Sequence, residues 1–202
     1  FGLKDHRTKN TCLLRMIEEG VALSDQVTLC ENVAEGLAPN FQSAGFVKPD
    51  WVTLIERGEL RGSLVSPRSA QEYGVPTTGA REGEVPESLD LAAGGLPAER
   101  ILAELGTGLY VGNLWYLNYS DRPGGRVTGL TRFGTFWVEG GEFVCPVNVM
   151  RFDETIYRAL GEKLVGLTRE REFRPDAGTY GGRSTSSFRV PGALIDDFTL
   201  TL

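Results

Sequence analysis

Residues 106–161 contain β-rich runs separated by strong turn signals, and this segment constrains the fold more than any other. The run 109–119 carries apolar residues at both parities, which predicts a strand covered on both faces and therefore central in its sheet. Asp-Arg-Pro-Gly-Gly at 121–125 is turn chemistry, because proline fixes one dihedral angle and glycine accepts positive φ. Gly140 and Gly141 predict a two-residue hairpin turn. We therefore expect an antiparallel sheet here.

Short capped helical segments and further β-rich runs occupy the remainder of the chain. Helices are expected at 11–19, 66–74, 97–106 and 153–161, and strands at 27–29, 51–56, 59–65, 88–92, 188–190 and 198–202. An ordered loop pinned by Phe41 and Phe46 is expected at 35–50, and a flexible surface segment at 75–85. The prediction is an α+β fold, a largely antiparallel β-sheet with short flanking helices.

Length and charge limit the possible functions. The 202 residues suffice for one domain or two small ones, and the chain lacks an initial Met, so we expect a fragment of a longer protein. The formal net charge of −6, without a basic block, argues against direct nucleic-acid binding. No apolar stretch approaches the roughly 20 residues of a membrane span. Three cysteines without a C-x-x-C spacing are expected to be buried free thiols in a reducing cytoplasm.

Arginines within the β-rich block are candidates for binding a carboxylate. Arg126, Arg132 and Arg151 lie among aromatic residues and could form such a row. Alternatively, they stack on aromatic rings or pair with the local acids Asp121 and Asp153. A continuous hairpin with the two-residue turn would place Arg132 opposite Val149 and Phe136 opposite Cys145, with Cys145 on the sheet face of Leu130, Arg126 and Arg132.

The threonine- and glycine-rich run 127–135 suits close approach by another main chain. An extended peptide could bind at a strand edge there through main-chain hydrogen bonds. The alternative is plain sheet packing with glycine at a bulge. We predict that the substrate-binding residues are Asn118, Arg126, Thr128 and Arg132.

Catalytic residues are not apparent in this chain. His6 is the single histidine and has no partner at metal-ligand spacing. A serine nucleophile at 184–187 needs a base, and His6 is the sole candidate imidazole. A cysteine nucleophile at Cys145 lacks a partner for the same reason. Adjacent acids at 18–19 and 196–197 point apart on a helix or strand. We predict no catalytic or metal-binding residue within these 202 residues.

Three segments resemble the C-terminal region of the TldD/PmbA family, the so-called modulators of DNA gyrase. They are Pro-Asn-Phe-Gln-Ser-Ala-Gly-Phe at 39–46, Leu-Val-Ser-Pro-Arg-Ser-Ala at 64–70, and the long block 109–161 with its Asn-Tyr-Ser-Asp-Arg and Thr-Arg-Phe sequences. The resemblance implies that residues 1–202 are an α+β C-terminal domain preceded by a separate N-terminal domain. It also implies a cytoplasmic peptide hydrolase whose subunits pair around a chamber in which peptides are cleaved.

The resemblance further implies which subunit type this is. In the metal-binding branch, a His-Glu-x-x-x-His helix and a Cys in a Gly-Thr-Cys-Gly turn hold zinc. Here the corresponding turn is Ala-Gly-Thr-Tyr-Gly-Gly at 177–182, so Tyr180 occupies the Cys position. A phenol, with a pKa of about 10, is a poor zinc ligand at neutral pH. The resemblance therefore favours the metal-free PmbA (TldE) type, without a cofactor in this chain.

The expected partners follow from that assignment. They are a zinc-carrying TldD-like subunit, or a second copy as a dimer, and an unfolded peptide as substrate. Two alternatives remain open. One is a self-sufficient zinc peptidase whose His-Glu-x-x-x-His lies upstream of Phe1. The other is a non-enzymatic module that binds peptide or glycan through exposed aromatic residues.

Overall fold

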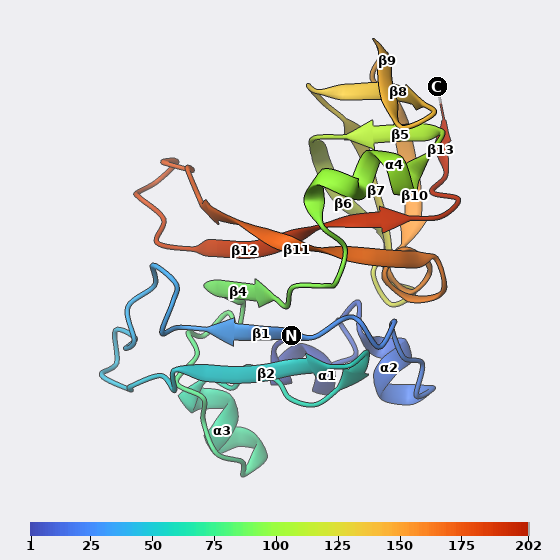
Figure 1. Cartoon of the computed structure of the whole chain (residues 1–202). Coiled ribbons are helices and arrows are strands. Elements are labelled where there is room, and N and C mark those ends of the chain that lie inside the picture. The colour runs from blue at the N-terminus through green and yellow to red at the C-terminus, as the bar shows by residue number, and fades with distance from the viewer. Residues whose placement is uncertain (202) are drawn as a thin grey trace.

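The protein, in a computed structural model that describes residues 1–201, is built around three β-sheets (Figure 1). The largest sheet has the strand order β11-β12-β4-β1-β2-β3. Its strands are β1 (Leu29–Asn32), β2 (Trp51–Glu56), β3 (Glu59–Leu60), β4 (Ser88–Leu91), β11 (Leu164–Pro175) and β12 (Ser187–Ile195). All strand pairs are antiparallel except β12 with β4, among the strands that the described residues form.

Two smaller sheets lie beyond the β11–β12 end of the largest one, opposite α3 (Figure 1). The four-stranded sheet has the order β13-β10-β7-β6, with bounds β6 (Leu114–Asp121), β7 (Arg126–Thr131), β10 (Arg151–Thr155) and β13 (Leu200–Thr201). The three-stranded sheet has the order β5-β8-β9, with bounds β5 (Gly108–Val111), β8 (Thr135–Glu139) and β9 (Glu142–Pro146). Antiparallel pairing dominates, so the predicted α+β class is confirmed.

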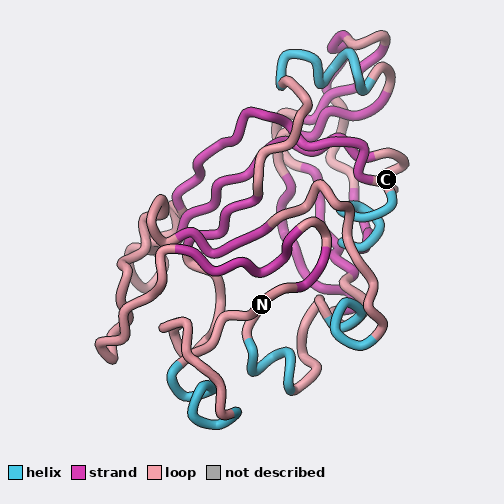
Figure 2. The backbone as a smooth tube through the Cα atoms, turned by 60° about the horizontal axis from the view of Figure 1, so that its bottom comes forward, coloured by secondary structure: helices cyan, strands magenta, loops and turns pink. Residues whose placement is uncertain are grey.

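Short helices lie at the periphery of the strands (Figure 2). They are α1 (Leu3–Arg7), α2 (Leu14–Glu18), α3 (Pro67–Tyr73), α4 (Ile101–Leu105), the 3₁₀-helix Ala98–Arg100 and the π-helical turn Arg158–Glu162. The predicted capping residues set the two ends of α3. The Ser66 hydroxyl accepts a hydrogen bond from the Ser69 N–H at 3.1 Å, and Gly74 ends the helix at φ +66°.

The main core packs the loops and helices of the first 30 residues against the largest sheet. Its buried members are Leu13, Met16, Leu23, Val27, Ile55, Tyr157, Leu164 and Leu167. Leu54, the neighbour of Ile55 in β2, belongs to a second buried cluster with Leu64 and Ala80. Since successive side chains in a strand point to opposite faces, β2 is covered on both sides.

The long run 109–119 is not one central strand, so that prediction was wrong. The chain leaves the three-stranded sheet after Val111 and enters the four-stranded sheet at Leu114. There β6 is the edge strand, and every one of its residues is exposed. Apolar residues at both parities indicate that both faces of a strand can be buried. They do not show that other residues of this chain bury them.

The predicted hairpin turn is confirmed, but the register beyond it is not. Gly140 and Gly141 have φ of +59° and +84°, and Glu139 pairs with Glu142. A bulge before Val138 then places Cys145 opposite Trp137 rather than Phe136. Cys145 is also in a different sheet from β7, because the chain turns at Phe133 with φ +56°. It therefore does not share a face with Leu130, Arg126 and Arg132.

Three local predictions also need correction. Asp153 lies inside β10, and the Thr155 hydroxyl instead accepts the Arg158 N–H at the following helical turn. Phe41 and Phe46 are exposed, and the loop 35–50 is held by other residues. The segment 75–85 is anchored, because Ala80 and Glu84 are buried.

Of the three free cysteines, Cys30 is buried as expected, whereas Cys12 is half-buried and Cys145 is exposed. The predicted strand 198–202 includes Leu202, which lies outside the described residues.

Candidate functional site

The four predicted substrate-binding residues come together on one face of the four-stranded sheet. Asn118 of β6 pairs with Thr128 of β7, and Thr128 pairs with Asp153 of β10, so their side chains share a face. Arg126 lies on that same face, because it is two positions before Thr128 in β7. Arg132 follows the end of β7, and its guanidinium lies over Trp115, which pairs with Leu130 on this face. We call this surface, completed by Trp115 and Arg151, the polar face. Its role in substrate binding remains a prediction.

Most arginines of the polar face already have partners. Arg126 pairs with Asp153 at 3.5 Å, and Ser120 donates a hydrogen bond of 3.0 Å to the same carboxylate. Arg151 donates through Nε to the Thr128 hydroxyl at 3.4 Å. The alternative of local pairing thus describes Arg126 well, and a continuous carboxylate-binding row does not form.

Arg132 has a different environment from the other arginines. Its guanidinium lies 4.2 Å from the ring centroid of Trp115 and 4.6 Å from that of Phe133. The main-chain N–H of Arg132 donates a hydrogen bond to the Asn113 carbonyl at 3.0 Å. This bond places the Arg132 backbone beside the start of β6. The alternative of stacking on aromatic rings thus describes Arg132. The sequence did not show that Trp115 is one of these rings, because Trp115 reaches Arg132 only through strand pairing.

The outer edge of β6 is open among residues 1–201, since only β7 pairs with this strand. A bulge between Trp115 and Asn118 places Tyr116 and Leu117 opposite Gly129. Tyr116 is 71% exposed and has φ +56°, an uncommon conformation for an aromatic residue. On the opposite face, a Cβ on Gly129 would come within 3.0 Å of Leu117 and Phe152. The absence of a side chain at Gly129 therefore allows Leu117 and Phe152 to pack against the sheet. This agrees with the alternative that the glycine serves sheet packing and not close approach by a peptide.

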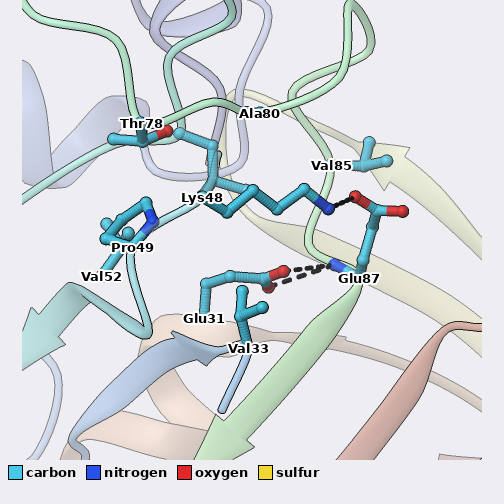
Figure 3. Close-up of a pocket in the computed structure, with 10 residues that line it drawn as sticks. Glu31, Val33, Lys48, Pro49, Val52, Thr78, Ala80, Val85 and Glu87 are labelled. Atoms are coloured by element: carbon cyan, nitrogen blue, oxygen red, sulfur yellow. Dashed lines mark hydrogen bonds and ion pairs between the residues drawn. The ribbon is translucent and has the colours of Figure 1, made fainter. Parts of the chain in front are cut away.

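A buried ionic cluster lines a small pocket beside β1 and β4 (Figure 3). Lys48 pairs with Glu87 in the interior, and Arg81 reaches the other oxygen of Glu87 at 2.8 Å from the surface. The Glu31 carboxylate accepts the N–H groups of Glu87 and Ser88 at 3.0–3.1 Å. Burial raises the pKa of Glu31 despite these hydrogen bonds. Since these groups satisfy one another, the cluster joins loop 35–50 to β4 and is structural.

The described residues do not fit a zinc site. His6 and Tyr180 were the positions to test, and Tyr180 is fully exposed in the loop between β11 and β12. Within residues 1–201, no three His, Cys, Asp or Glu side chains gather closely enough to hold a metal ion. The Nε2 atom of His6 is buried and makes no hydrogen bond to another described residue. His6 is thus a half-buried histidine of α1.

His6 is expected to titrate near pH 4. Burial is the main cause that lowers its pKa from 6.5 to about 4. Because the fold favours the neutral imidazole, its contribution to stability is present above pH 6.5 and is lost as the pH falls toward 4. The Hε1 resonance of this single histidine, followed by NMR against pH, measures the midpoint directly. A midpoint near 6.5 would contradict the burial of the ring.

Comparison with known proteins identifies the class as a metallopeptidase domain. The profile of the PmbA/TldA metallopeptidase C-terminal domain matches residues 5–202. The chain therefore belongs to the TldD/PmbA family, as its sequence segments predicted. It is 34% identical over 143 residues to the metalloprotease PmbA of Escherichia coli O157:H7, which covers 69% of this chain and 30% of that protein.

Solved structures share the fold along nearly the whole chain. TldE from Thermococcus kodakarensis superposes with a TM-score of 0.80 at 20% identity, covering 100% of this chain and 45% of that one. A putative modulator of DNA gyrase from Thermotoga maritima has a TM-score of 0.75 at 16% identity, covering 98% and 44%. The chain thus spans less than half the length of these relatives. None of the helices in residues 1–201 has the length and apolar character needed to cross a membrane.

Proposed function

We propose that this chain is the C-terminal domain of a metal-free, PmbA/TldE-type subunit in a cytoplasmic metallopeptidase. An N-terminal domain precedes it, and a TldD-like partner supplies the zinc. The open edge of β6 is the observation that carries this proposal. An exposed edge strand with aromatic side chains and no Lys or Pro to block it is unusual in an isolated protein. It suits a chamber wall that holds an extended peptide.

The hydrogen-bonding groups of β6 support the addition of a strand. Thr131 donates its N–H to Met150 of the β10 side at 2.9 Å, so by alternation Thr128 and Leu130 direct their main-chain groups toward β6. Their partners Asn118 and Trp115 therefore face β7. The main-chain groups of Tyr119 point the other way, toward the open edge. An extended peptide can pair with them irrespective of its sequence.

Metal analysis tests the assignment to the metal-free subunit. The full-length protein is purified alone and after co-expression with a TldD-like subunit, and zinc is measured by mass spectrometry. We expect no stoichiometric zinc on the protein alone and about one zinc ion for each pair of subunits, because a phenol replaces the thiolate ligand. Chelation should abolish peptide cleavage by the pair and leave peptide binding unchanged.

Stoichiometric zinc on the protein alone would refute the metal-free assignment and favour the self-sufficient peptidase. Peptide binding without cleavage, in the presence of a TldD-like subunit that is active with other partners, would instead favour the non-enzymatic binding module. A pair that carries zinc and cleaves peptides only when both subunits are present supports the proposal.

A further inference from the structure

We infer that Arg132 binds a carboxylate of the peptide that lies along β6, an inference that rests on the proposed function. Trp115 and Phe133 approach the Arg132 guanidinium at 4.2 and 4.6 Å, measured to the ring centroids. Stacking engages the flat faces of a guanidinium and leaves the N–H groups at its edge available. Those N–H groups match the two oxygens of a carboxylate.

The charges of the polar face favour an anionic ligand. The polar face carries the three arginines Arg126, Arg132 and Arg151. Two carboxylates stand against them, Asp153 and Asp121, and Asp121 pairs with Arg126 in register. Asp153 is already paired with Arg126, and it lies in the middle of β10, away from Arg132 in register. A positive excess here stands out in a chain with a net charge of −6. It would attract an acidic group and repel a basic one.

The position of Arg132 indicates where on the peptide the carboxylate lies. Arg132 is hydrogen-bonded to Asn113, just before β6 begins at Leu114. A peptide antiparallel to β6 runs from the Asp121 end toward the Leu114 end. Its C-terminal residues then reach the end of β6 where the Arg132 guanidinium lies over Trp115. Either the C-terminal carboxylate or an acidic side chain near that end can then meet the guanidinium.

The backbone beside Trp115 and Arg132 has an uncommon, left-handed conformation. Tyr116 and Phe133 flank the Trp115–Arg132 pair, and both have φ +56°. Their rings are 71% and 73% exposed, so no burial within residues 1–201 rewards this conformation. A left-handed backbone at a non-glycine residue is strained. Contact between these rings and a bound peptide accounts for their exposure.

Three labelled peptides test the inference by fluorescence anisotropy with the full-length protein alone. Each alternates Val and Thr over eight residues and ends in Glu-amide, Gln with a free carboxylate, or Gln-amide. We expect the carboxylate-bearing peptides to bind about 5- to 10-fold more tightly than Gln-amide. Arg132→Gln should remove this preference and retain the affinity for Gln-amide, which also verifies folding. Arg68→Gln, an exposed arginine on the distant α3, should change none of the affinities.

The outcomes separate the two proposals. Preference for Glu-amide alone assigns an acidic side chain, and preference for the free C-terminus alone assigns the terminal carboxylate. Equal affinities for all three peptides refute the carboxylate site but leave the β6 edge in place. Two further peptides, each N-methylated on one of the two alternate sets of amides, test the edge itself. If methylation in neither alternate set weakens binding, or if no peptide binds, the proposed function fails and the carboxylate site fails with it.

Discussion

Replacing Lys48 with alanine is expected to lower the free energy of unfolding by about 3 kcal/mol. The ammonium and the Glu87 carboxylate are both nearly inaccessible to solvent, at 4% and 7% exposure of their side chains. Removing one member of a buried pair leaves the other charge in an environment of low polarity. Arg81 reaches Glu87 from the surface and offsets part of this cost. Urea unfolding of the wild type and the variant measures the difference.

A matched surface pair and a double variant provide the controls. Lys9→Ala, which breaks an exposed ion pair with Glu18, should cost less than about 1 kcal/mol. The double variant Lys48→Met with Glu87→Leu should be more stable than Lys48→Met alone, because no unpaired carboxylate remains buried. A Lys48→Ala variant as stable as Lys9→Ala would show that the cluster does not hold loop 35–50 to β4.

Replacing Gly58 with alanine is expected to destabilise the protein by about 3 kcal/mol or more. Gly58 has φ +79° in the turn between β2 and β3, and its missing Cβ would lie 2.3 Å from the Leu23 carbonyl oxygen. That carbonyl cannot move freely, because Leu23 donates its N–H to the Gly58 carbonyl and Gly58 donates to Val27. Thermal and urea unfolding of Gly58→Ala measure the loss.

Gly74→Ala is the control that isolates the steric part of this effect. Gly74 has a similar φ of +66°, but nothing lies within 4 Å of the position of its Cβ. The variant should lose only the backbone term, on the order of 1 kcal/mol. Equal losses at Gly58 and Gly74 would mean that contact with the Leu23 carbonyl contributes nothing.

Local elements of this fold could be predicted because their signals lie within a few residues. The Ser66, Pro67 and Gly74 pattern predicted the bounds of α3, and Gly140-Gly141 predicted the hairpin turn. Each involves a hydrogen bond or a dihedral angle set by neighbours in the chain. The family assignment likewise followed from contiguous segments, and residues 5–202 match its profile.

Only part of the candidate site could be predicted. Alternation along β7 correctly placed Arg126, Leu130 and Arg132 on one face, since it depends on the strand period alone. Asn118 joins them through pairing across β6 and β7. Pairing with Asp153 and stacking on aromatic rings were both expected as alternatives, but the sequence did not show which arginine has which partner, because Asp153 and Trp115 reach them from other strands.

The amino-acid sequence by itself determined the α+β class, the family, the turns, and the absence of a second histidine beside His6. Only the tertiary structure decided that β6 is an exposed edge, that Cys145 lies in another sheet, and that Arg132 contacts the ring of Trp115. The physical reason is the reach of the interactions. Caps and tight turns close over a few residues, whereas a bulge or one left-handed residue, as at Phe133, redirects every strand pairing that follows.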